Sequence, residues 1–269
     1  MRSVDADSDR VALNLREWLE VEELGDFTFN AECWTERECD QDALIDALGR
    51  EITTNYADRA WLERRLACMG YERLAAHVRA TVLLSAGNTR TGDFGEIVST
   101  LMLRRHKGFF VPLLRLRYKD SPGGTQRLLD IVAFKFRDPP DRTVIAISEV
   151  KTRTNSAPSI AAEAAGQLAG AVKDLPLSLS FMDRRLTAEG KHFLADRVAA
   201  LLDPDARFVL EQHVFVVTDS DAVHADTLHR LDDEPSASEI TASLVLLDGL
   251  AQLIADAYDS AGGLRDLTG

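Results

Sequence analysis

The chain has 269 residues, of which 45% are hydrophobic and 28% are charged, enough for one sizeable core plus an elaboration. Its 16 glycines and 8 prolines follow no period, which excludes collagen-like, low-complexity and solenoid chains. Three cysteines without a C-x-x-C pair argue against both disulfide and zinc sites. No uncharged apolar run approaches the roughly 18 residues of a membrane-spanning helix, so we expect a soluble cytoplasmic protein.

The formal net charge of -13 is unevenly distributed along the chain. Residues 87–154 carry 13 basic and 7 acidic side chains, whereas the remainder carries 18 basic and 37 acidic ones. The last 70 residues alone carry 3 basic and 14 acidic side chains. One basic segment therefore lies inside an otherwise acidic protein, and any contact with nucleic acid is expected there.

The first 86 residues are predicted to be mainly helical. Alternating residues at 18–22 and 27–31 indicate an early strand pair, and helical spacing follows at 40–48, 58–67 and 71–84. The stretch 85–89 breaks the pattern. We place a boundary there, with an N-terminal region over 1–86 and a second domain over 87–269.

Beyond this break, helices and strands alternate. Helices are predicted at 93–107, 157–173, 187–202 and 239–258, and strands at 112–119, 127–136, 143–150 and 213–218. A Ser-Pro-Gly-Gly turn at 121–124 would close a hairpin between the first two strands. This order predicts the α/β class, with a mixed central sheet flanked by helices.

Charged residues interrupt two neighbouring strands of the basic segment. Asp130 lies within one predicted strand, and Glu149 and Lys151 end the next. Side chains at i and i+2 of a strand share a face, so Glu149 and Lys151 project together. If the two strands pair, Asp130 approaches Glu149 on that face.

These residue types suit phosphodiester chemistry. Carboxylate oxygens are the ligands that Mg²⁺ prefers, and a lysine can orient water or offset charge on phosphorus. Upstream, Asp93 and Glu96 share one side of a predicted helix. Glu96 can supply a further carboxylate, whereas Asp93 is more simply a helix-start residue.

Two of the six lysines, Lys151 and Lys191, lie two residues after a glutamate. The Glu-x-Lys tripeptide alone is therefore close to chance. Lys191 follows a turn and has no acid-bearing strand upstream, which excludes it. The alternative interpretation of Asp130, Glu149 and Lys151 is a set of solvated or ion-paired residues at a sheet end. A carboxylate inside an apolar strand favours function, because an unpaired buried charge is costly.

The arrangement resembles the PD-(D/E)XK, or restriction-endonuclease-like, superfamily, and more narrowly the DUF1837 family, which includes the HamA nuclease subunits of Hachiman anti-phage systems. The resemblance lies in NTRTGDFGEIVSTLMLRR at 88–105, RLLDIVAFKF at 127–136 and IAISEVKTRT at 145–154. It implies Mg²⁺ or Mn²⁺ held by Glu96, Asp130 and Glu149, with Lys151 as the catalytic lysine. The proline of the superfamily's name is absent, since Leu128 and Leu129 precede Asp130.

Basic side chains of the same segment could follow a DNA backbone. They are Arg104, Arg105, Lys107, Arg115, Arg117, Lys119, Arg127 and Arg153. The alternative is an ordinary helix end and an exposed strand face. Gln167, in the helix after the glutamate-x-lysine motif, is more simply a surface residue than a contact with the site or DNA.

Regulation by a partner is expected from the charge and from the resemblance. The acidic remainder should repel free DNA, and the chain lacks a Walker A motif for ATP-driven translocation. The resemblance implies a superfamily 2 helicase partner of the HamB type. The acidic C-terminal 70 residues and the N-terminal region are candidate docking surfaces, unless the acidity serves only to keep the protein monomeric. A catalytically silent interaction module with the same fold is the alternative function.

Overall fold

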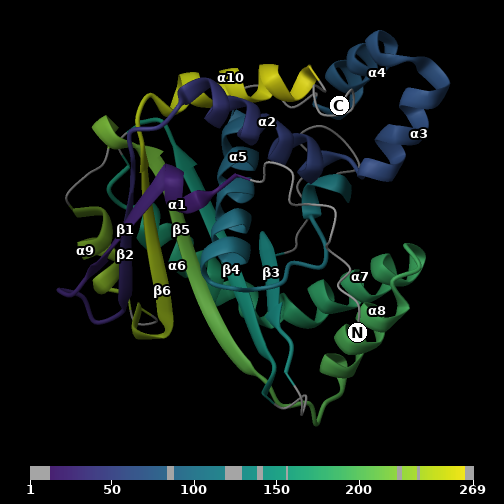
Figure 1. Ribbon diagram of the computed structural model, residues 1–269. Helices are drawn as coiled ribbons and strands as arrows, with labels where there is room; N and C mark the ends of the chain where they lie inside the picture. The colour runs from purple at the N-terminus through teal and green to yellow at the C-terminus, as the bar shows by residue number, and fades with distance from the viewer. Residues whose placement is uncertain are drawn as a thin grey trace.

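The computed structural model describes residues 13–83, 88–118, 129–137, 142–155, 157–222, 226–234 and 237–263. They form a six-stranded sheet in the order β1-β2-β6-β5-β4-β3, flanked by helices (Figure 1). The strands are β1 (Leu19–Leu24), β2 (Asn30–Glu36), β3 (Ile131–Lys135), β4 (Val144–Arg153), β5 (Val209–Asp219) and β6 (Ile240–Leu247). The prediction of an α/β protein with a mixed, helix-flanked sheet is confirmed.

The middle of the sheet is parallel and its two edges are antiparallel. β2, β6, β5 and β4 run parallel to one another, while β1 pairs antiparallel with β2 and β3 antiparallel with β4. Parallel strands need cover on both faces because their connections cross over the sheet. β4 shows this cover, since Ala146 belongs to one apolar core and Ile145 and Ile147 to the other.

Each face of the sheet has its own helices. The first face carries α5 (Asn88–Leu101), with α2 (Gln41–Tyr56) and α10 (Leu250–Gly262) packed together along one end of the sheet (Figure 1). The second carries α6 (Ile160–Ala171), α7 (Leu175–Ala188), α8 (His192–Ala199) and α9 (Asp226–Asp232). The short helices α1 (Leu15–Trp18), α3 (Arg59–Met69) and α4 (Tyr71–His77) complete the N-terminal part.

The strand pair predicted near the N-terminus is present as β1 and β2, displaced by a few residues toward the C-terminus. β2 also pairs with β6, the last strand of the chain. Residues on the N-terminal side of the boundary predicted at 86 therefore share one sheet with residues 87–269. The boundary itself lies outside the described residues.

The helix predicted over 239–258 is wrong in its first half. Residues 240–247 form β6, and α10 begins only after Gly249, whose φ of 58° is a backbone conformation that glycine adopts readily. The leucines at 244, 247, 250 and 253 match a helical period by chance, because a strand buried on both faces has no alternation to reveal it. The helix predicted at 187–202 is likewise two helices, the end of α7 and α8, separated around Gly190.

The strand predicted over 112–119 is also wrong in its described part. The segment makes one bridge to the sheet, between Phe110 and Phe134, and then forms a 3₁₀ turn over Arg115–Tyr118. Leu116 is buried in this turn, and its neighbouring arginines bind protein groups instead of facing solvent. The predicted 121–124 turn lies outside the described residues.

Candidate active site

The predicted acids meet where β3 begins and β4 ends. The antiparallel register pairs Ile131 with Ser148, which sets Asp130 opposite Glu149. One oxygen of Asp130, Oδ2, accepts a hydrogen bond from the backbone N–H of Val150 at 3.0 Å. This bond fixes the carboxylate of Asp130 against the strand that carries Glu149 and Lys151.

Lys151 is held between two acceptors. Its Nζ lies 2.6 Å from Oε1 of Glu149, and it also donates to Oε1 of Gln167 on α6. The side chains of Lys151 and Glu149 are only 16% and 13% exposed. The lysine ammonium is therefore positioned by two groups from different elements, and Gln167 belongs to the site.

Glu96 of α5 lies on the other side of Asp130, and a guanidinium joins the two. Arg115 donates from Nη2 to Oε2 of Glu96 at 2.5 Å and from Nε to Oε1 at 3.1 Å. The same Nη2 lies 2.9 Å from Oδ1 of Asp130. Glu96, Arg115 and Asp130 thus form a continuous ion network, with side chains at most 19% exposed.

Burial dominates the electrostatics of this cluster. It raises the pKa of Glu96 to about 7, in spite of the opposing charge of Arg115. Burial and the neighbouring charge of Asp130 raise the pKa of Glu149, while Lys151 acts in the opposite direction. Burial disfavours the charge of Arg115, but Glu96 and Asp130 outweigh it and raise the arginine's pKa above its already high ordinary value. Arg115 is therefore a permanent cation among crowded carboxyls.

Asp93 has a different role from the helix start that its sequence position suggested. It lies in the middle of α5, is 4% exposed, and accepts a hydrogen bond from the hydroxyl of Tyr56. The hydroxyl of Tyr258 on α10 lies 3.1 Å from that of Tyr56. Asp93 therefore connects α5 to α2 and α10, while Glu96 faces the acid cluster.

A divalent cation would find suitable donor atoms here. Glu96, Asp130 and Glu149 are carboxylates. Burial and the charge of Asp130 raise the pKa of Glu149, and a cation would offset both effects. As the side chains stand, however, no group of three or more His, Cys, Asp or Glu among the described residues is arranged to hold a metal. The three carboxylates are the right donor type for a divalent cation. The guanidinium of Arg115, however, occupies the place beside Glu96 and Asp130 where such a cation would bind.

The predicted DNA-contacting residues do not form one track within the described chain. Arg115 is in the acid cluster, Arg117 donates to the carbonyl of Thr54, and Lys107 pairs with Glu32 at 2.6 Å. Arg153 is exposed just beyond the site. Arg104 and Arg105 lie in the π-helical turn after α5, Met102–His106, while Lys119 and Arg127 lie outside the described residues.

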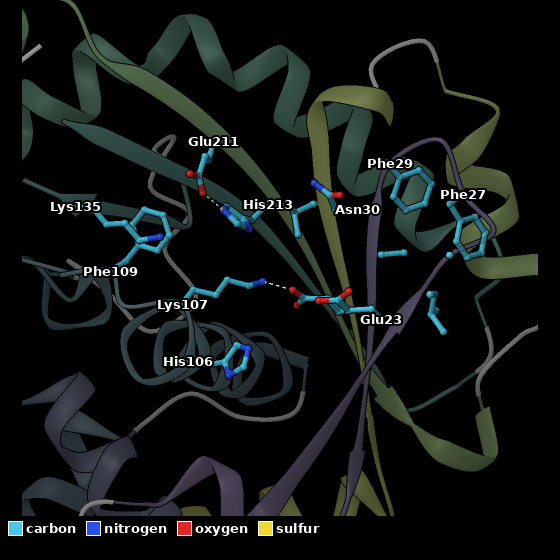
Figure 2. A pocket seen from close by; sticks show the side chains of 15 residues that line it. Glu23, Phe27, Phe29, Asn30, His106, Lys107, Phe109, Lys135, Glu211 and His213 are labelled. Atoms are coloured by element: carbon cyan, nitrogen blue, oxygen red, sulfur yellow. Dashed lines mark hydrogen bonds and ion pairs between the residues drawn. The ribbon is translucent and has the colours of Figure 1, made fainter. Parts of the chain in front are cut away.

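A pocket of about 710 Å³ lies elsewhere, between the β1–β2 hairpin, the N-terminal part of β5 and the segment after α5 (Figure 2). None of the predicted catalytic residues lines it. Its lining carries three glutamates, Glu23, Glu32 and Glu211, against two lysines, Lys107 and Lys135, and Lys107 pairs with Glu32. The pocket therefore has no excess of positive charge that would attract a phosphate, and the acid cluster remains the candidate site.

A comparison with known protein families shows which family the chain belongs to. The chain matches the HamA family over residues 15–247, from α1 to the end of β6. The chain belongs to the HamA family. A comparison with curated proteins finds no match.

Membership in the HamA family relates the chain to Hachiman anti-phage defence. The HamA match includes β1 and β2 as well as Glu96, Asp130, Glu149 and Lys151, so the N-terminal strands and the acid cluster belong to one family unit. No helix in the described part of this HamA chain is long and apolar enough to cross a membrane.

Proposed function

We propose that the chain is a metal-dependent DNA nuclease that hydrolyses phosphodiester bonds in anti-phage defence under the control of a partner helicase. The observation that carries this proposal is the meeting of Asp130, Glu149 and Lys151 where β3 begins and β4 ends, with Glu96 joined to Asp130 through Arg115. Family membership supports the defence context.

The residues would divide the chemistry between them. Glu96, Asp130 and Glu149 would hold Mg²⁺ or Mn²⁺, which supplies Lewis-acid activation of the phosphodiester and of a bound water when present. Lys151 contributes a fixed ammonium, which can donate a hydrogen bond to the attacking water and offset the charge that develops on the phosphate. Gln167 positions that ammonium by accepting a hydrogen bond from it.

A catalytically silent interaction module is a second candidate, and one observation favours it. Arg115 already pairs with Glu96 and Asp130, so the cluster forms a structural ion network without metal. Such a module would bind neither Mg²⁺ nor Mn²⁺, and replacing Asp130 or Lys151 would leave its biological effect unchanged. Calorimetric titration with Mn²⁺ distinguishes the two functions.

A comparison of two acids on α5 tests the assignment of the ligands. Glu96→Gln should raise the metal concentration needed for half-maximal cleavage by about tenfold or more, because a carboxylate ligand is lost. Asp93→Asn should have a much smaller effect, since the carboxylate of Asp93 accepts a hydrogen bond from Tyr56 and acts on Glu96 through its charge. Cleavage measured across a Mn²⁺ series provides the comparison, and the reverse ranking would show that Asp93 is the ligand.

A further inference from the structure

Arg115 is placed unusually for an arginine of a DNA-binding segment. It comes from the 3₁₀ turn Arg115–Tyr118, and its guanidinium contacts two acids from different elements, Glu96 of α5 and Asp130 before β3. Its side chain is 18% exposed. Arg115 is thus directed toward the acid cluster and away from solvent.

The guanidinium and a divalent cation would need the same oxygens. Oε2 of Glu96 and Oδ1 of Asp130 lie 2.5 Å and 2.9 Å from Nη2 of Arg115. Two cations at one pair of carboxylates repel each other strongly in a partly buried site. Binding of a metal to these oxygens therefore requires the guanidinium to move away from them.

The turn around Arg115 is anchored, so the side chain is the part that can move. Leu116 is 3% exposed in the core, and Arg117 donates two hydrogen bonds to the carbonyl of Thr54. Tyr118 packs against Phe181 and under the guanidinium of Arg185. These contacts hold the backbone on the C-terminal side of Arg115 in place.

We propose that Arg115 is an internal counter-ion that competes with the divalent cation for Glu96 and Asp130. The inference rests on the proposed function, because it takes the acid cluster as the metal site. It assigns Arg115 a positioning role that sets the metal affinity of the free chain. A chain in this state binds metal weakly until the guanidinium is drawn away.

Calorimetric titration of the full-length chain with Mn²⁺ tests the proposal. Arg115→Met should bind Mn²⁺ at least about tenfold more tightly than the unaltered chain, because charge-assisted hydrogen bonds no longer have to be broken. Arg37→Met is the matched control, since Arg37 pairs with Glu20 of β1, at the opposite edge of the sheet from β3, and should leave the affinity unchanged. Equal or weaker binding by Arg115→Met, or no binding by any variant, overturns the proposal.

Thermal unfolding provides a second readout in case Arg115→Met folds poorly. Removing the guanidinium leaves Glu96 and Asp130 unneutralised, so the melting temperature of Arg115→Met should fall in chelator and recover on addition of Mn²⁺. A loss of stability that Mn²⁺ does not restore contradicts the competition. The proposed function fails separately, if the unaltered chain cleaves no DNA at any metal concentration, so the two failures are distinguishable.

Discussion

Glu96 combines near-complete burial with a carboxyl in direct contact with a guanidinium. Its pKa of about 7 lies above the ordinary value of 4.5, mainly because of burial. Between these values the folded chain keeps a proton that the unfolded chain has released, so raising the pH favours unfolding. The contribution of Glu96 to stability is full below pH 4.5 and is lost as the pH rises through 7.

A comparison with Glu96→Gln isolates this contribution. The free energy of unfolding of the unaltered chain, minus that of Glu96→Gln, should fall by about 2–3 kcal/mol between pH 5 and 8. Urea unfolding at several pH values measures it. A difference that is constant across this range would show that the Glu96 carboxyl titrates normally.

The residues of the site differ in how far the sequence could place them. Asp130, Glu149 and Lys151 are predictable together, since strand alternation and pairing across a short connection determine their faces. Arg115 is not, because its alternating surroundings predict a strand, whereas the 3₁₀ turn directs its side chain to Glu96. Gln167 could have been found from its position on the helix that covers the face carrying Glu149 and Lys151.

At the scale of elements, the contact of α5 with β4 places Glu96 beside the strand that carries Glu149. Gly95 allows this close approach, since a Cβ at that position would lie 1.8 Å from Oγ1 of Thr152 and 3.3 Å from Cγ1 of Val150. Both neighbours belong to β4. The helix therefore requires the absence of a side chain directly before Glu96.

Gly95→Ala should lower the free energy of unfolding by about 1–3 kcal/mol, because it forces α5 away from β4. Gly92→Ala in the same helix is the control. A Cβ there meets nothing within 4 Å, so alanine should raise stability by up to about 1 kcal/mol. Adding Thr152→Ala to Gly95→Ala should recover part of the loss. Chemical denaturation measures all three variants, and equal effects at Gly92 and Gly95 would contradict the close packing.

The elements themselves were predictable where one face is polar and the other apolar, as in α2. β6 was not, because its run of buried apolar residues continues into α10 without a polar face to mark the change. The strand order could not be predicted from the sequence either, because the neighbouring strands β2 and β6 are separated by about 200 residues.

At the scale of the whole molecule, the net charge of -13 opposes binding to free DNA. Screening over roughly 8 Å at physiological salt leaves only the local basic segment to attract a backbone. Several of its arginines and lysines already bind protein groups. We therefore expect a weak intrinsic affinity for DNA, in keeping with the proposed control of the nuclease by a partner.

We expect the chain to co-purify with a superfamily 2 helicase encoded beside it, and its cleavage of DNA to change when that helicase is present. Size-exclusion chromatography of the co-expressed proteins and a cleavage assay with and without the helicase measure both effects. The acidic C-terminal 70 residues and the N-terminal region are the expected docking surfaces. A chain that elutes alone, and cuts DNA equally in both conditions, would argue against a regulating partner.

The most direct measurement is cleavage of plasmid DNA by the purified chain in Mg²⁺ and in chelator, beside Lys151→Ala and Lys191→Ala. Both lysines follow a glutamate at the same spacing and pair with it, at 2.6 Å and 2.7 Å. Lys191 is 43% exposed and lies outside the acid cluster, whereas Lys151 is 16% exposed beside Asp130 and Glu149. The account predicts Mg²⁺-dependent cleavage that Lys191→Ala retains and Lys151→Ala loses by at least about a hundredfold. Cleavage that survives chelator, or equal activity of the two variants, would contradict it.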